Sequence, residues 1–128
     1  IENQTTTEED SYEQYLVKKD VQFIEKIHQV IEENLDNSDF NIDTIASTIG
    51  LSRSAFFKKL KSLTGFAPVD LVKEIRLNKS IELIKNSDMS ISEIAFAVGF
   101  KDSGYFSKCF RKKYDQTPRE YMNEWRKG

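Results

Sequence analysis

The amino-acid sequence predicts an all-α protein with about seven helices, and three observations lead to that prediction. Apolar residues recur at intervals of three and four along most of the chain, and no segment alternates convincingly as a β-strand would. Gly50, Gly65 and Gly99 lie between the periodic segments, where glycine commonly ends a helix. A pattern that runs from Ile42 to Pro68 returns from Ile91 to Pro118, as expected of one helical unit used twice.

The first predicted helix begins at Asp20, which can cap it, and ends near Leu35. His28 lies on this helix without a nucleophile pattern nearby, so we expect a surface or boundary residue there and not a catalytic base. Residues 1–19 are polar and acidic with little periodicity, which predicts a flexible linker ahead of a folded domain at 20–128. The apolar stripe of the helix consists of Phe23, Ile24, Ile27, Ile31 and Leu35.

Three helices follow in and after the first copy of the repeat. One begins at Asn41 or Asp43 and runs through Ile49, and the next begins after Ser52 and runs to about residue 63. Pro68 opens a long helix that reaches about residue 86, since proline is tolerated in a first turn. The two halves of this long helix carry separate apolar sets, so we expect them to pack against different copies of the repeat. The sets are Leu71, Val72 and Ile75, then Leu77, Ile81 and Ile84.

The second copy predicts the same arrangement. Ser90 caps a helix over 91–98 that Gly99 ends, and Asp102 caps a helix over about 103–114. Pro118 opens a last helix, which we expect Tyr121 and Trp125 to anchor on the second copy. Cys109, next to core residue Phe110, is interpreted as a small apolar side chain.

Each copy therefore consists of a short helix, a glycine turn and a longer helix, which is the pattern of a helix-turn-helix. Gly50 and Gly99 are 49 residues apart, whereas Phe56 and Phe106 are 50 apart, so the second copy has one extra residue in its turn. This predicts a first helix-turn-helix subdomain at 20–66, a linking helix at 67–87 and a second subdomain at 88–128.

Charge is divided unevenly along the chain. Residues 1–40 hold 11 acidic and 3 basic residues, for a net charge of −8, and residues 41–128 hold 10 acidic and 16 basic residues, for +6. The sum is the overall −2. A basic excess on the repeats is what a nucleic-acid binder with an acidic leader would show, although a solvated basic surface gives the same count.

The outward face of the longer helix in each copy carries cations, hydroxyls and small residues. Such side chains suit a DNA groove, because Arg and Lys reach phosphates or guanine edges and Ser bonds to either. Phe57 either contacts a thymine methyl or packs against a neighbouring helix, whereas Phe56 and Phe106 are assigned to the core. The candidate DNA-binding residues are Arg53, Ser54, Phe57, Lys58 and Lys61 in the first copy, and Ser103, Gly104, Ser107, Lys108 and Arg111 in the second.

Other functions find little support in the sequence. There is no paired-carboxylate motif, no phosphate-binding glycine loop and no nucleophile–base set, so we expect no enzyme and no cofactor in this fragment. With one His and one Cys, we expect no zinc site, and the single cysteine suits a reducing compartment. No apolar run is long enough to span a membrane. Because the chain begins with Ile1, we expect it to be a piece of a longer protein.

Two segments carry a resemblance to a known family. ISEIAFAVGFKDSGYFSKCFRKKYDQTPREY in the second copy and IASTIGLSRSAFFKKLKSLTGFAP in the first, with Arg76 and Leu77 between them, resemble the C-terminal DNA-binding domain of AraC/XylS transcription regulators. The resemblance covers about 20–126. It implies that the longer helix of each copy enters the major groove, with all the candidates except Lys61 and Arg111 facing bases. It departs at Asp115–Gln116, where the family usually has glycine.

The resemblance also has consequences for function. Lys58 and Lys108 stand where many relatives have Arg, so they are expected to serve phosphates more than guanines, and Gly104 offers no side chain to read a base. The phrasing SRSAFFKKLKSLTG and the acidic leader resemble output domains of Bacteroidetes hybrid two-component sensors. This implies double-stranded DNA as partner, upstream receiver and kinase domains, possible contact with RNA polymerase, carbohydrate-responsive activation and a cytoplasmic domain. No small-molecule ligand is expected in this fragment. The alternative is a helical protein-interaction module without specific DNA affinity.

Overall fold

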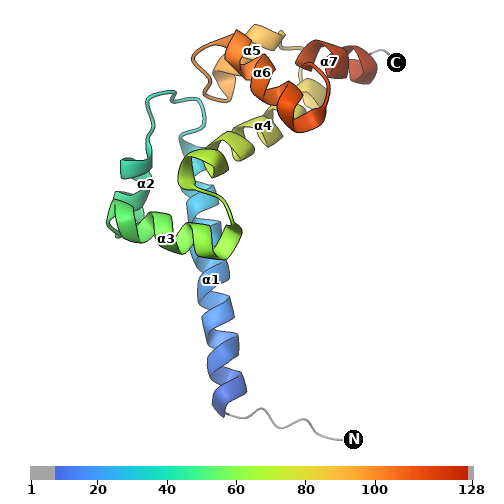
Figure 1. Ribbon diagram of the computed structural model, residues 1–128. Coiled ribbons are helices and arrows are strands. Elements are labelled where there is room, and N and C mark those ends of the chain that lie inside the picture. The colour runs from blue at the N-terminus through green and yellow to red at the C-terminus, as the bar shows by residue number, and fades with distance from the viewer. Residues whose placement is uncertain (1–7, 127–128) are drawn as a thin grey trace, which may run out of the picture.

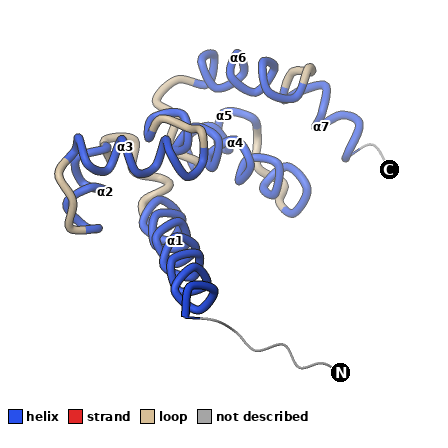
Figure 2. The backbone as a smooth tube through the Cα atoms, turned by 60° about the horizontal axis from the view of Figure 1, so that its bottom comes forward, coloured by secondary structure: helices blue, strands red, loops and turns tan. Residues whose placement is uncertain are grey.

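The computed structural model describes residues 8–126, and these residues form seven α-helices and no strand (Figures 1 and 2). The prediction of an all-α fold is confirmed. The helices are α1 (Glu8–Glu33), α2 (Ile42–Ile49), α3 (Arg53–Thr64), α4 (Pro68–Asn86), α5 (Ile91–Ala97), α6 (Ser103–Tyr114) and α7 (Pro118–Arg126).

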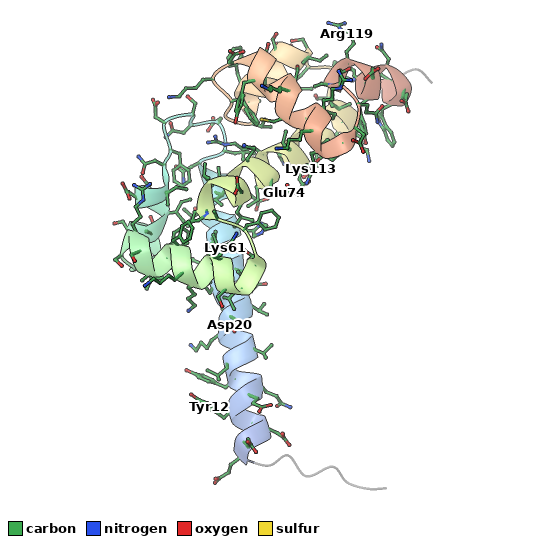
Figure 3. The ribbon with its side chains drawn as sticks, in the orientation of Figure 1. Tyr12, Asp20, Lys61, Glu74, Lys113 and Arg119 are labelled. Carbon is green, nitrogen blue, oxygen red and sulfur yellow. The ribbon has the colours of Figure 1, made fainter. Side chains whose placement is uncertain are left out.

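Helix α1 corrects the prediction that the first helix begins at Asp20. It begins at Glu8, and its N-terminal half, with Tyr12 and Asp20, extends away from the other helices (Figure 3). Glu, Gln, Leu and Lys, which favour helices, make up seven of residues 8–19, and the acidic first turn interacts favourably with the helix dipole, so this part forms without burial. Residues 1–7 of the expected linker lie outside the described residues. The expected apolar stripe is buried except Ile24, which packs partly, and Val30 joins it.

Local capping chemistry sets the remaining helix ends. Asn41 accepts a hydrogen bond from the Thr44 N–H, and Gly50 ends α2 with φ of 88°. Ser52 caps α3 through the Ala55 N–H, and Asp102 caps α6 in the same way. These predicted caps are confirmed. Helix α5 ends at Ala97, one residue earlier than expected.

Helix α4 belongs to both halves of the molecule. It contacts α1 and α3 of the first unit and α5 and α7 of the second. Figure 1 shows it running from one unit to the other. All residues of its two predicted apolar sets are buried except Ile81, which is partly buried. Because α4 is a single rigid element, it fixes how the two helix-turn-helix units are placed relative to each other.

The last helix is held by a different residue from the one expected. Tyr121 packs on Phe110 with ring centroids 5.8 Å apart, as predicted. Trp125, however, is 52% exposed and lies under the Lys85 ammonium of α4, so the expectation that it anchors α7 on the second copy was wrong. Arg126 is the anchor instead. Its guanidinium donates to the carbonyl oxygens of Ile84, Ser87 and Met89, which end α4.

The structural repeat is larger than the sequence repeat. Arg76 lies 50 residues before Arg126, and its Nη2 donates to the Asn37 carbonyl after α1, just as Arg126 binds the carbonyls at the end of α4. Each unit thus comprises a supporting helix, the helix-turn-helix pair and a closing helix. Helix α4 closes the first unit and supports the second.

Candidate nucleic-acid interface

The five candidates on α3 share one exposed face. Their spacing of one, three, one and three residues keeps them on adjacent turns of one side of the helix. All five are exposed, with 47% of Phe57 open to solvent, which favours its outward placement over burial. Phe56 and Leu60 on the opposite side are fully buried. The exposed residues are Arg53, Ser54, Phe57, Lys58 and Lys61.

Helix α6 presents the same five helix positions. Gly104, Lys108 and Arg111 are exposed, whereas Ser103 and Ser107 are half-buried. Phe106 and Phe110 fill the core behind them, with their ring centroids 5.8 Å apart. The two candidate sets therefore lie on separate helices, one in each unit, and α4 spans the distance between them (Figure 1).

Each helix is fixed from behind by contacts with its supporting helix. Phe23 of α1 packs edge-on against Phe56 of α3, with centroids 6.4 Å apart. On the other unit, the Lys113 ammonium of α6 forms an ion pair with Glu74 of α4 (Figure 3). The Tyr114 hydroxyl donates to the Asn78 side-chain oxygen over 3.0 Å, and burial raises the pKa of Tyr114 to about 12. This tyrosine stays neutral and keeps its proton for that bond.

The cations on these faces differ in how free they are. Lys58, Lys61 and Lys108 form no ion pair within residues 8–126. Arg53 pairs with Asp43 of α2 at 3.4 Å, but both side chains are well exposed, so this pair costs little to exchange for a phosphate. Lys59, between two candidates, instead lies over the Phe23 ring at 4.3 Å and supports packing. The free lysines are thus placed to meet an anionic partner.

The sequence reasoning missed one exposed side chain at this interface. Tyr105 is 50% exposed on α6, next to candidate Gly104, where the first copy has Ala55. Its ring contacts Phe100 and the Lys73 ammonium of α4, at 6.0 and 5.7 Å between centres. The sequence did hold a signal for this residue, because a tyrosine stands at 105 where the equivalent position of the first copy has Ala55.

A helix-turn-helix family model matches residues 45–124, which include all of α3, α4 and α6. The chain belongs to the AraC-type helix-turn-helix family.

As an AraC-type domain it is similar to several solved structures. The C-terminal domain of the two-component response regulator yesN from Fusobacterium nucleatum is 31% identical, with a TM-score of 0.70, over 77% of this chain and 95% of that one. The DNA-binding domain of the transcription factor AdpA, solved with a target DNA, is 28% identical, with a TM-score of 0.74, over 82% and 93%. The chain is therefore a DNA-binding domain of a transcription regulator.

The chain spans only a small part of the length of a longer relative. Histidine kinase P4 of Formosa agariphila is 38% identical over 106 residues, which are 83% of this chain and 8% of that protein.

Across residues 8–126, no helix has the length and apolar character needed to cross a bilayer, and no cluster of His, Cys, Asp and Glu could hold a metal ion.

Proposed function

We propose that this AraC-type domain is the DNA-reading output module of a carbohydrate-responsive two-component protein and acts as a transcription activator in the cytoplasm. Upstream receiver and kinase domains, and RNA polymerase, are its proposed partners. The similarity to a histidine kinase more than ten times its length supports the first part of this proposal. The observation that supports DNA reading is that α3 exposes all five candidate positions and α6 exposes three of the equivalent five, and each helix is backed by buried aromatic residues.

In this proposal, α3 and α6 each enter the major groove. Helix α4 has 19 residues and spans roughly 28 Å at ~1.5 Å per residue, which suits two reading helices about one turn of DNA apart. Because the residues on the two faces differ, the site need not be palindromic, and it covers on the order of 15–20 bp. The first face, with Arg53 and Phe57, has more groups that discriminate bases than the second, where Gly104 has no side chain.

The test is selection of bound sequences from a random duplex pool at about physiological salt. We expect a motif with two elements about one turn apart. One element alone would mean that one unit only grips phosphates. No enrichment, together with affinity that is absent or insensitive to salt, would overturn the proposal and favour a protein-interaction module.

A further inference from the structure

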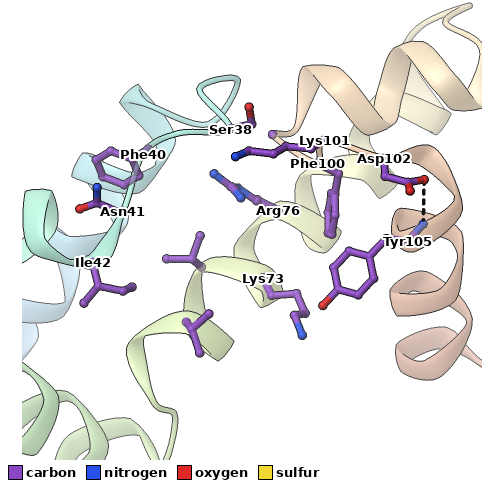
Figure 4. A pocket seen from close by; sticks show the side chains of 13 residues that line it. Ser38, Phe40, Asn41, Ile42, Lys73, Arg76, Phe100, Lys101, Asp102 and Tyr105 are labelled. Carbon is purple, nitrogen blue, oxygen red and sulfur yellow. Dashed lines mark hydrogen bonds between the residues drawn. The ribbon is translucent and has the colours of Figure 1, made fainter.

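A cleft lies between the two helix-turn-helix units, and none of the ten candidate DNA-binding residues is in its lining, although Tyr105 at its edge is next to Gly104 (Figure 4). It has a volume of about 470 Å³ and is bounded by residues 38–42 before and at the start of α2, by one side of α4, and by residues 99–105 around the α5–α6 turn. Apolar side chains form much of its wall, among them Phe40, Val69, Val72 and Phe100. This is the size and character of a small-molecule site.

Three cations line the same cleft. They are Lys73 and Arg76 of α4 and Lys101 of the turn. The one carboxylate in the lining, Asp102, accepts from the Gly104 N–H at 2.6 Å and the Tyr105 N–H at 3.3 Å as the α6 cap. Lys101 also pairs with Asp39 at 3.1 Å, but both side chains are mostly exposed, so this pair is weak. The cleft therefore has an excess of positive charge.

Arg76 is the most constrained of these cations. Its Nη2 donates to the Asn37 carbonyl at 3.3 Å, and its Nε is buried without a hydrogen-bond partner. Burial lowers the pKa of Arg76, yet a guanidinium stays charged in proteins. The Arg76 side chain lines the cleft, and a planar cation beside an apolar wall favours an organic anion such as a carboxylate.

We propose that this cleft binds an organic monocarboxylate with an apolar body. The carboxylate lies against Arg76 and Lys101, and the hydrocarbon part packs along Val69, Val72 and Phe40. A DNA phosphate is a poorer occupant, because phosphate oxygens would gain nothing from the apolar wall. No single segment of the sequence holds this site, because only the packing of both units on α4 forms it.

The test uses the whole domain and decanoate as probe, kept below its micelle concentration. Amide shifts in NMR spectra report where it binds and how tightly. Decanol supplies the tail without the charge, and acetate supplies the charge without the tail. Val69→Glu puts a carboxylate at the cleft wall, where Val69 is 60% exposed, and Val17→Glu makes the same change on α1 at a residue 62% exposed. Circular dichroism verifies that both variants fold.

We expect decanoate to shift the amides of 38–42 and 99–105 saturably and more strongly than decanol or acetate. Val69→Glu should weaken binding at least ~10-fold, and Val17→Glu should leave it unchanged. Equal binding of decanol, equal loss in both variants, or no saturable shift would overturn the proposal. So would a random DNA duplex that displaces decanoate and shifts the amides of 38–42 and 99–102, which hold no DNA-binding candidate, since the cations would then serve phosphate. The decanoate titration contains no DNA, so its failure leaves the proposed DNA reading intact.

Discussion

At the residue scale, the C-cap residues that follow α3 and α6 show that two different amino acids adopt the same left-handed backbone conformation. Gly65 after α3 has φ of 80°, and Asp115 at the equivalent place after α6 has φ of 61°. Asp115 is the one non-glycine residue with positive φ in the described chain. Aspartate tolerates the left-handed region better than most residues, but glycine adopts it at no steric cost. The family's usual glycine is thus replaced without loss of the turn.

Asp115→Gly is expected to stabilise the domain by about 0.5–1 kcal/mol, because it removes the strain of a left-handed aspartate. Urea unfolding at constant pH measures this. The reciprocal Gly65→Asp should lower the unfolding free energy by a similar amount. A destabilised Asp115→Gly variant would show that the aspartate side chain contributes more than its backbone costs.

The Ser90–Glu93 capping box makes stability depend on pH. The Glu93 carboxylate accepts from the Ser90 N–H at 2.8 Å, which lowers the pKa of Glu93 below its ordinary 4.5. A lowered folded-state pKa gives stability that is present above the unfolded value and lost as the pH falls through the folded value. Glu93→Gln should therefore be less stable than the parent near neutral pH, and the gap should narrow below pH 4.5.

Thermal unfolding at a series of pH values measures that gap. Glu124→Gln, an exposed carboxylate of α7 outside any capping box, is the control and should follow the parent throughout. A constant gap between the parent and Glu93→Gln at all pH values would contradict the assignment.

At the element scale, each reading helix is a two-sided object with a core face and a partner face. The division is sharp on α3, where Lys58 is free and Lys59 covers the Phe23 ring. Helix α7 is held in a different way, because a single residue, Arg126, joins it to the end of α4 and the following loop through three carbonyl oxygens. Element identity came from periodicity, but which face meets which neighbour came from the packing.

Lys58→Ala should weaken DNA binding several-fold and reduce the slope of log affinity against log salt by about 1, if its role is one phosphate contact. Lys59→Ala is the matched control with the same loss of charge next door, and its effect on affinity should be smaller because the side chain lies on Phe23. Fluorescence anisotropy over a salt series measures both. Loss confined to one DNA sequence would instead assign Lys58 to base reading.

Arg126→Ala should destabilise the domain by about 2–4 kcal/mol, because three partly buried carbonyl oxygens lose a charged hydrogen-bond donor. Arg119→Ala on the same helix is exposed and without such bonds, so we expect it within about 0.5 kcal/mol of the parent. Guanidinium unfolding compares them. Equal stability of the two variants would show that Tyr121 alone holds α7.

At the scale of the whole molecule, the two units meet where the α5–α6 turn packs on the loop after α1. Gly99 in that turn has φ of 96°, and a Cβ there would lie 2.2 Å from the Leu35 carbonyl oxygen and 2.7 Å from the Arg76 Nε. Its repeat partner Gly50 has φ of 88° and open space around it. A glycine thus follows the short helix in both copies, but only Gly99 allows the two units to pack closely.

Gly50→Ala should cost about 1 kcal/mol, from backbone strain alone. Gly99→Ala should cost about 3 kcal/mol or more, because the clash with backbone adds to the same strain. Chemical denaturation separates the two costs. Similar losses would mean that the contact between the units yields easily.

The sequence by itself determined the helices, their caps and the repeat, because capping and periodicity act over a few residues. It placed the start of α1 at Asp20 because the preceding turns lack an apolar stripe, whereas charge and propensity extend the helix to Glu8. It expected Trp125, with Tyr121, to anchor the last helix on the second copy, although Trp125 is 52% exposed and Arg126 holds that helix. The ten DNA-facing candidates remain predictions, with eight of them exposed.

Only the tertiary structure decided what depends on both units at once. Arg76 and Gly99 stand out in the sequence for separate reasons, and only the packing on α4 brings them together with Lys101 at one cleft. No local pattern encodes that meeting, because it follows from the length of α4 and from which of its sides each unit covers. The physical reason is that caps and turns are short-range interactions, whereas a site between two subdomains is set by how rigid elements pack.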